Sequence, residues 1–309
     1  MLADRLCGRH HAPMAAVEVA DLHVQYGDVE AVRGVAFSVA EGEVFGLLGP
    51  NGAGKTSTLE VCEGYRAPSS GRVQVLGRDP ADRALRQTVG VVLQDIAVTP
   101  FLSVREVVTR NAAYYDHPRG VEDVVALVGL QDKAAARVNT LSGGQQRRLD
   151  LALGIIGRPT LLFLDEPTTG FDPSARRGAW EVIRALRDEG TTIVLTTHYL
   201  EEAEALADRV CVLAAGRVLA EGPPAALSGR DDAPATVRFG LPDGPLPPVA
   251  PGDVVTRNGD LIAVATTDAV RTLHVLTGWS LERGTPLAGL IVERPSLEDV
   301  YLQLTAGAA

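Results

Sequence analysis

The chain has 309 residues, of which 46% are hydrophobic and 22% are charged, and its formal net charge is -10. This length and composition predict a globular protein with one large and one small domain. The negative charge argues against a nucleic-acid-binding protein that relies on basic patches. No run approaches the roughly 20 apolar residues of a membrane-spanning helix, so a membrane role would need a partner. The cysteines Cys7, Cys62 and Cys211 are far apart, which fits a reducing cytosol.

The first 14 residues are polar and are predicted to form a disordered tail, not a secretory signal. Met14 stands just before the first predicted strand. Translation starting at Met14 instead of Met1 is therefore an open alternative.

Alternating apolar and polar residues predict half-buried strands at 17–26 and 32–39. A short apolar strand at 44–48 runs directly into glycine-rich sequence. Further elements are predicted as strands at 73–76, 89–93, 161–164, 192–196 and 210–213, with a helix at 175–187. This alternation predicts an α/β fold with a largely parallel sheet flanked by helices.

Between about 95 and 157 the strand signal disappears, and amphipathic patterns at 104–115 and 121–128 predict a helical insertion. Beyond residue 221 a proline-rich stretch leads to strands within 254–265, where Asn258-Gly259 predicts a type I′ hairpin. A helix at 269–276, a strand at 287–292 and a final helix at 297–304 complete a small α+β domain. The predicted domains are residues 15–226 and 227–309.

The segment Gly49-Pro50-Asn51-Gly52-Ala53-Gly54-Lys55-Thr56 fits the phosphate-binding pattern GxxxxGK[ST] between a strand and a helix. Backbone N–H groups of such a loop, continuing to Ser57, would bind ATP phosphates. Lys55 would bridge two phosphates, and Thr56 would bind Mg²⁺. The alternative is an ordinary glycine turn. Against it, only Lys55 and Lys133 of the 29 basic residues are lysines, and a compact ammonium fits such a loop better than a guanidinium.

Two carboxylates, Asp165 and Glu166, follow the apolar strand at 161–164. Asp165 is predicted to associate with Mg²⁺, and Glu166 to act as the base for the attacking water. The alternative is a solvated acidic turn that ends the strand.

The segment Leu141-Ser142-Gly143-Gly144-Gln145, upstream of these carboxylates, resembles the signature motif of ATP-binding cassette (ABC) ATPases. Ser142 and Gly144 would offer a hydroxyl and backbone N–H groups at a helix N-terminus to a γ-phosphate. The simpler interpretation, which is compatible with the first, is that Ser142 caps a helix running through Leu153. The resemblance covers residues 17–226 and implies a P-loop NTPase fold of the ABC type.

The resemblance also assigns roles to four further residues. Gln94 would contact Mg²⁺ or water, and His198 the γ-phosphate. Tyr26 would stack on adenine, the alternative being a core aromatic of an edge strand. Asp172 would lie at a dimer contact.

The resemblance implies that the cassette acts as a homodimer, or with a homologous ATPase subunit, and that the signature serves the partner's nucleotide. Residues 196–203 and 295–301 are similar to the ATPase subunits of ABC-2-type exporters, including those of daunorubicin resistance. The alternative for Glu201, Glu202 and Glu204 is a solvated helix face. An ABC-2-type integral membrane permease is therefore expected to contact residues 94–104 and the insertion, with this chain peripheral on the cytoplasmic face of the membrane.

Two other functions stay open at this point. One is a soluble ABC ATPase that acts on ribosomes or DNA, although no nucleic acid is expected from the net charge. The other is a regulatory nucleotide-binding module without turnover, which Glu166 and His198 argue against.

Overall fold

The computed structural model describes residues 15–93, 99–227, 234–242 and 246–293. The chain divides into two compact units between Pro223 and Pro224, close to the boundary expected after residue 226. The predictions for the tail at 1–14, for Gln94 and for the helix at 297–304 lie outside the described residues.

A six-stranded sheet forms the centre of the first unit, with the strand order β5-β6-β7-β3-β8-β9. In that order the strands are β5 (Val89–Val92), β6 (Leu161–Asp165), β7 (Thr192–Thr197), β3 (Val44–Leu48), β8 (Arg209–Ala214) and β9 (Arg217–Gly222). The first five are parallel, and every residue of β3, β6 and β7 is buried, which is typical of parallel strands covered on both faces. The antiparallel edge strand β9 was not predicted.

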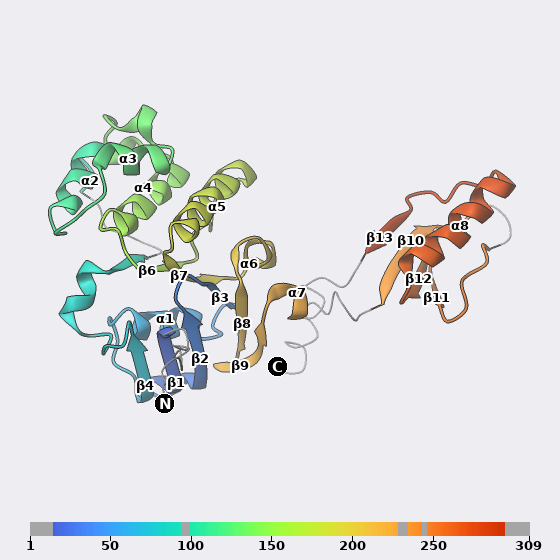
Figure 1. Cartoon of the computed structure of the whole chain (residues 1–309), viewed down its shortest axis with the longest axis horizontal. Helices are drawn as coiled ribbons and strands as arrows, with labels where there is room; N and C mark the ends of the chain where they lie inside the picture. The colour runs from blue at the N-terminus through green and yellow to red at the C-terminus, as the bar shows by residue number, and fades with distance from the viewer. Residues whose placement is uncertain (1–14, 94–98, 228–233, 243–245, 294–309) are drawn as a thin grey trace, which may run out of the picture. The chain divides into compact units, whose positions relative to one another are not determined.

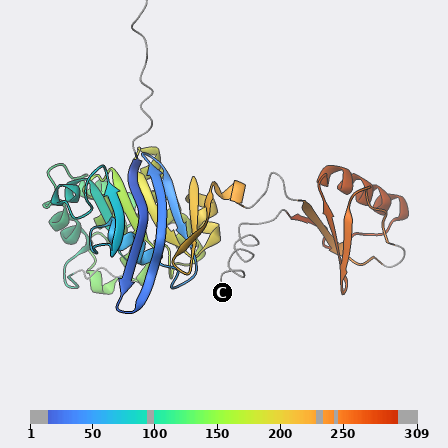
Figure 2. The same ribbon diagram turned by 90° about the horizontal axis from the view of Figure 1, so that it is seen from below.

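A separate antiparallel sheet has the order β2-β1-β4 and consists of β1 (Ala15–Tyr26), β2 (Val29–Ala40) and β4 (Ser70–Val75). Figure 2 shows β1 and β2 as two long blue strands lying side by side. Helix α1 (Lys55–Cys62) shares one apolar core with this sheet and with one face of the six-stranded sheet. The alternating pattern predicted the strands but not their separation from the parallel sheet.

The helical insertion contains α2 (Val104–Ala112), α3 (Val121–Leu127) and α4 (Gly143–Ile155), with short 3-10 turns η2 (Gln131–Lys133) and η3 (Val138–Thr140). These helices lie together in Figure 1, drawn in green. Their apolar residues form a second core with α5 (Pro173–Asp188), α6 (Leu200–Leu206) and the other face of the six-stranded sheet. Leu162 and Leu164 of β6 point into this core and Leu161 and Phe163 into the first, as strand alternation requires.

Among the residues that the structure describes, no helix combines the length and the apolar character needed to cross a membrane.

The second unit has an antiparallel sheet of order β11-β12-β10-β13 and a core of five buried residues that includes Leu276 of α8. Its elements are α7 (Pro224–Leu227), β10 (Ala235–Gly240), β11 (Val254–Asn258), β12 (Leu261–Thr266), α8 (Ala269–Arg283) and β13 (Ile291–Glu293). The α+β prediction is therefore correct. Strand β10 was missed, and α8 extends beyond the predicted end at residue 276.

The turn between β11 and β12 differs from the predicted type I′ turn at Asn258-Gly259. Asn258 pairs with Leu261, so the loop residues are Gly259 and Asp260. Of these two, only Gly259 has a positive φ, at 63°. Type I′ needs positive φ at both loop positions, and glycine at the first position alone is typical of type II′. The prediction of turn type is therefore wrong.

Candidate functional site

The phosphate-loop residues lie between β3 and α1, at the carboxyl edge of the parallel sheet. Gly54 precedes α1 with a φ of 99°, and a Cβ on Gly54 would lie 2.7 Å from the Ala31 carbonyl oxygen. A Cβ on Gly49 would lie 2.3 Å from the Leu213 carbonyl oxygen. Glycine is required at both positions. The loop, together with Ala31, Ser57 and Glu166, lines a hollow of about 390 Å³.

Lys55 turns its ammonium back into this loop and is only 5% exposed. Its Nζ donates to the carbonyl oxygens of Gly49 at 2.8 Å and Pro50 at 3.1 Å. Nζ also lies 3.9 Å from Oε1 of Glu166. Burial lowers the pKa of Lys55, and the nearby carboxylates of Glu166 and Asp165 oppose that effect.

Asp165, at the end of β6, places its carboxylate against hydroxyl groups of two other elements. Its Oδ2 accepts from Thr56 Oγ1 at 3.3 Å, and its Oδ1 accepts from Thr196 Oγ1. Burial raises the pKa of Asp165, and the hydrogen bond from Thr196 partly offsets this. The site thus holds a desolvated carboxylate beside a threonine hydroxyl.

Glu166 has a left-handed backbone, with φ at 46°, which is uncommon outside glycine. Its N–H donates to the carbonyl and hydroxyl oxygens of Thr196, at 3.2 and 3.0 Å. Its Oε2 accepts from Thr169 Oγ1 at 3.1 Å. Its Oε1 lies 3.2 Å from Nδ1 of His198, without hydrogen-bond geometry. The carboxylate therefore faces both Lys55 and His198.

His198 follows β7, and its ring lies against the ring of Tyr199 with 4.1 Å between the centroids. The other aromatic contact of Tyr199 is the guanidinium of Arg176 from α5, 4.5 Å from the ring centroid. Because Tyr199 contacts both His198 and Arg176, the orientation of the His198 ring depends on α5 as well as on β7.

The signature segment begins α4 and does not reach the hollow of its own chain. Ser142 and Gln145 form a capping box, with Gln145 N–H donating to Ser142 Oγ at 3.3 Å and Ser142 N–H donating to Gln145 Oε1 at 3.0 Å. Within the part of the chain that the structure describes, a Cβ added to Gly143 or Gly144 would meet no atom within 4 Å. Among the described residues, the phosphate-loop hollow is lined by none of 142–145.

Tyr26 ends β1 with an exposed ring, so it is not the core aromatic considered as the alternative. Its hydroxyl bonds to Ser57 Oγ and donates to Glu60 Oε2, both at 3.1 Å. The Arg66 guanidinium lies 4.1 Å from the ring centroid. The structure thus places Tyr26 beside the phosphate loop with Arg66 stacked on its ring.

Asp172 caps the N-terminus of α5, since its Oδ1 accepts from the N–H groups of Ser174 and Ala175 at 2.9 Å. The preceding Phe171 is buried against Ala175 and Ala179. Asp172 therefore has a structural role within its own subunit.

No site role was predicted from the sequence for the buried charged residues Arg147 and Glu202. Arg147 of α4 donates to backbone carbonyls at the ends of β5 and β6. Glu202 of α6 accepts from Thr168 Oγ1 at 2.7 Å and Trp180 Nε1 at 3.1 Å, so the solvated-face alternative is wrong for this residue. The sequence marks each of them only as a charged residue at a helix position whose spacing predicts a buried side chain.

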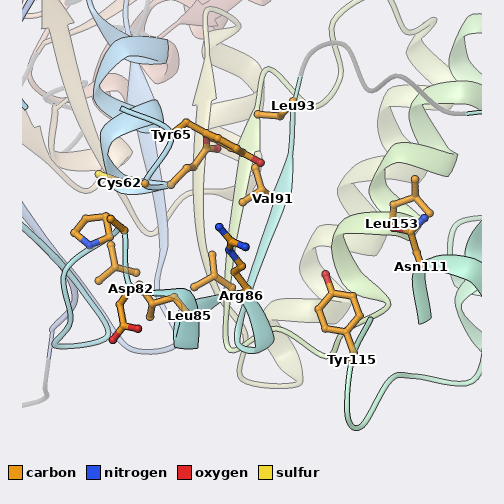
Figure 3. A pocket seen from close by; sticks show the side chains of 16 residues that line it. Cys62, Tyr65, Asp82, Leu85, Arg86, Val91, Leu93, Asn111, Tyr115 and Leu153 are labelled. Atoms are coloured by element: carbon orange, nitrogen blue, oxygen red, sulfur yellow. The ribbon is translucent and has the colours of Figure 1, made fainter. Parts of the chain in front are cut away.

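A second hollow, of about 460 Å³, lies between the sheets and the helical insertion. In Figure 3, Cys62, Tyr65 and Arg86 lie on one side of this hollow, and Asn111, Tyr115 and Leu153 of the insertion lie on the other. Leu93, the residue before Gln94, also lines this hollow.

Glu63, which follows α1, lines the same hollow and has a buried Oε1 that finds no hydrogen-bond partner among the described residues. Burial raises its pKa to about 8, with smaller contributions from the charges of Asp165 and Glu60. A folded-state pKa above the unfolded value makes the protein lose stability as pH rises from the unfolded pKa, about 4.3, toward 8.

We therefore expect Glu63→Gln to remove this loss, because glutamine mimics the protonated acid. The melting temperature of the variant should match the wild type at pH 4 and exceed it by about 2–8 °C at pH 9. Thermal melts across this range test the prediction. A difference between the two proteins that does not change with pH would contradict it.

The fold and this site define a P-loop ATPase: a phosphate loop, a buried carboxylate beside its threonine, and a second carboxylate facing its lysine. The ABC transporter family matches residues 32–169, and residues 235–296 match an ABC transporter domain-containing protein-like C-terminal domain. This chain belongs to the ABC transporter family and is an ATP-binding, ATP-hydrolysing subunit of an ABC transporter.

Similar proteins include the Nod factor export ATP-binding protein I of Rhizobium sp. (strain N33), which is 40% identical over 94% of this chain and 97% of its own length. The protein of that name from Rhizobium etli is 46% identical over 68% of this chain and 69% of its own length. The solved structure of cbiO1 from Clostridium perfringens, part of the ABC transporter complex cbiONQ, matches with a TM-score of 0.61. It is 27% identical over 70% of this chain and 91% of that chain. Neither alternative function raised by the sequence is supported by these relatives.

Proposed function

We propose that two copies of this chain, or one copy and a homologous ATPase subunit, bind two ATP molecules between them. Each ATP is held by the phosphate loop of one subunit and covered by residues 142–144 of the other. The observation that carries this proposal is the position of the signature segment. Ser142 and Gly143 are exposed, both glycines of the segment have open space beside them among the described residues, and residues 142–145 do not line the described hollow of their own chain. ATP binding would close the dimer, and hydrolysis would reopen it.

The donor set of this site suits Mg²⁺, which prefers oxygen ligands. Thr56 Oγ1 and Asp165 Oδ2 lie 3.3 Å apart, and Asp165 is desolvated. We propose that these two residues, with Gln94, hold Mg²⁺ together with the phosphates. The ion would neutralise charge on the transferred phosphoryl group.

Glu166 is the proposed base for the attacking water. Its carboxylate lies at the mouth of the phosphate loop, and its backbone is fixed on the N–H side by Thr196. Nδ1 of His198 lies 3.2 Å from Oε1 of this carboxylate, and His198 is proposed to contact the γ-phosphate. Tyr26 is proposed to stack on adenine beside the loop. Asp172, which caps the N-terminus of α5, is proposed to contact the second subunit.

The second hollow is the proposed contact surface for an ABC-2-type membrane permease. Its walls come from the sheet region and from the helical insertion, so a partner seated there would sense their relative movement. Exposed aromatic side chains occur on segments next to these walls. They are Tyr65 after α1, Phe101 before α2 and Tyr114 after α2. Exposed aromatic groups of this kind often mark protein contacts.

The direction of transport proposed for this chain is export. Its relatives at 40% identity across nearly the whole chain are named as export proteins. The chain would lie on the cytoplasmic face of the membrane and bind it through the permease.

We expect Tyr65→Asp to lower the amount of permease that co-purifies with the tagged subunit from detergent-solubilised membranes by about tenfold. A buried aspartate at this contact would lose the aromatic packing and add an unpaired charge. Val29→Asp is a matched control, because Val29 and Tyr65 are both 65% exposed and Val29 begins β2, away from this hollow. Equal recovery of permease with Tyr65→Asp and wild type would count against this surface.

A further inference from the structure

Arg147, in the second turn of α4, contacts two backbone segments that are distant from it in the sequence. Its guanidinium donates through Nη1 to the carbonyl oxygen of Leu93 and through Nη2 to that of Asp165, at 2.5 Å, and of Glu166, at 3.2 Å. The side chain is 9% exposed. A planar fork can serve several acceptors at once, which an ammonium at the same place cannot do with the same geometry.

The charge of Arg147 is balanced within the same helix. Asp150 is also buried, and its Oδ2 lies 3.9 Å from Nη1 of Arg147. Breaking one partner of such a buried set leaves polar groups without their hydrogen bonds, which is costly. The position of the guanidinium is therefore well determined.

Two of the acceptors of Arg147 are the backbone carbonyls of Asp165 and of Glu166, the proposed base. Glu166 has a left-handed φ of 46°, a conformation that persists only where surrounding contacts impose it. Thr196 fixes the N–H of Glu166, and Arg147 fixes its carbonyl. The third acceptor is the carbonyl oxygen of Leu93, the residue before Gln94.

We propose that Arg147 is a positioning residue for hydrolysis in its own subunit: it ties the helix that begins with the signature to the backbone of Glu166. This inference rests on the proposed dimer, in which the N-terminus of α4 meets the partner's nucleotide. The two functions of α4 then act on different sites. Ser142 serves the ATP of the partner, whereas Arg147 serves the ATP of its own chain.

Arg147→Gln should lower kcat by about 10- to 100-fold, because a displaced base is poorly aligned with the water. The affinity for ATP, measured with a fluorescent analogue, should change by less than about threefold, since the carbonyl groups that accept from Arg147 belong to Leu93, Asp165 and Glu166. Arg147→Lys should restore part of the rate. Arg148→Gln is the matched control with the same loss of charge, and its guanidinium lies near Gly129 instead.

Mixed dimers decide between action on the subunit's own site and on the partner's. In a dimer of Arg147→Gln and Glu166→Gln subunits, the single site with an intact Glu166 also contains the Arg147 lesion, so activity should stay as low as in the Arg147→Gln homodimer. Recovery to the rate of one intact site would overturn the proposal, because Arg147 would then act through the signature.

The dimer of Ser142→Arg and Glu166→Gln subunits separates failure of this inference from failure of the proposed function. If that dimer is active while the Arg147→Gln and Glu166→Gln dimer is not, the results support both the trans arrangement and the positioning role of Arg147. If that dimer is inactive, the trans arrangement fails, and with it the separation of roles along α4. An unchanged kcat in the Arg147→Gln homodimer would overturn only the inference about Arg147.

Discussion

Glu166→Gln lowers the rate of ATP hydrolysis by about 10²- to 10⁴-fold and leaves the affinity for ATP within about threefold of wild type. Glutamine keeps the shape of the side chain and an oxygen that accepts from Thr169 Oγ1, now 3.1 Å from Oε2. It cannot take a proton from water. The loss therefore falls on the chemical step, and single-turnover phosphate release with a parallel binding measurement would show it.

The comparison variant is Lys55→Arg, which we expect to lose binding as well as turnover. The Lys55 ammonium fits between the Gly49 and Pro50 carbonyl oxygens at 2.8 and 3.1 Å, in a side chain that is 5% exposed. A guanidinium fork is too wide and too rigid for this position.

If Glu166→Gln kept more than a tenth of the wild-type rate, another group would have to act as the base.

The buried strands at the site could be predicted from the sequence to within a residue. β3, β6 and β7 each contain a run of apolar residues and are buried throughout, because a parallel sheet covered on both faces leaves no exposed side. The edge strand β9 has no such run, since most of its residues are half-buried or exposed. β10 alternates apolar and polar residues, with Ala235, Val237 and Phe239 buried, so the sequence contained the signal for this strand and the prediction overlooked it.

The separation of the two sheets could not be predicted in the same way. Alternation in β1 and β2 indicates that one face of each strand is buried, and it says nothing of which strands pair. The pairing of β1 with β4 depends on contacts between Val17 and Val75 and between Val19 and Val73, which only the folded chain brings together.

At the site, local motifs predicted the residues whose positions are set by the neighbouring sequence. Lys55, Asp165 and Glu166 follow directly from a strand and its loop. Arg147 and Glu202 depend instead on tertiary partners, namely the Leu93 carbonyl for the first and Trp180 for the second. Buried charge is recognised by what surrounds it, and a sequence pattern does not state the surroundings.

A mixed dimer of Ser142→Arg and Glu166→Gln subunits regains ATP hydrolysis that neither variant has alone. The arginine would block the exposed N-terminus of α4, where Gly143 and Gly144 leave open space. If residues 142–144 cover the partner's nucleotide, both lesions fall in one composite site, and the other site contains neither. We expect about half of the wild-type rate per dimer, since one of two symmetric sites is intact.

The matched control carries the same two lesions on one chain, paired with a wild-type chain. In the trans arrangement each composite site then contains one lesion, so this dimer should be inactive. If the signature served its own phosphate loop, the outcomes would reverse: the wild-type chain would stay active, and the first mixed dimer would not. Purifying each dimer by two different tags and measuring phosphate release distinguishes the two arrangements, because the lesions are identical and only their distribution between the chains differs.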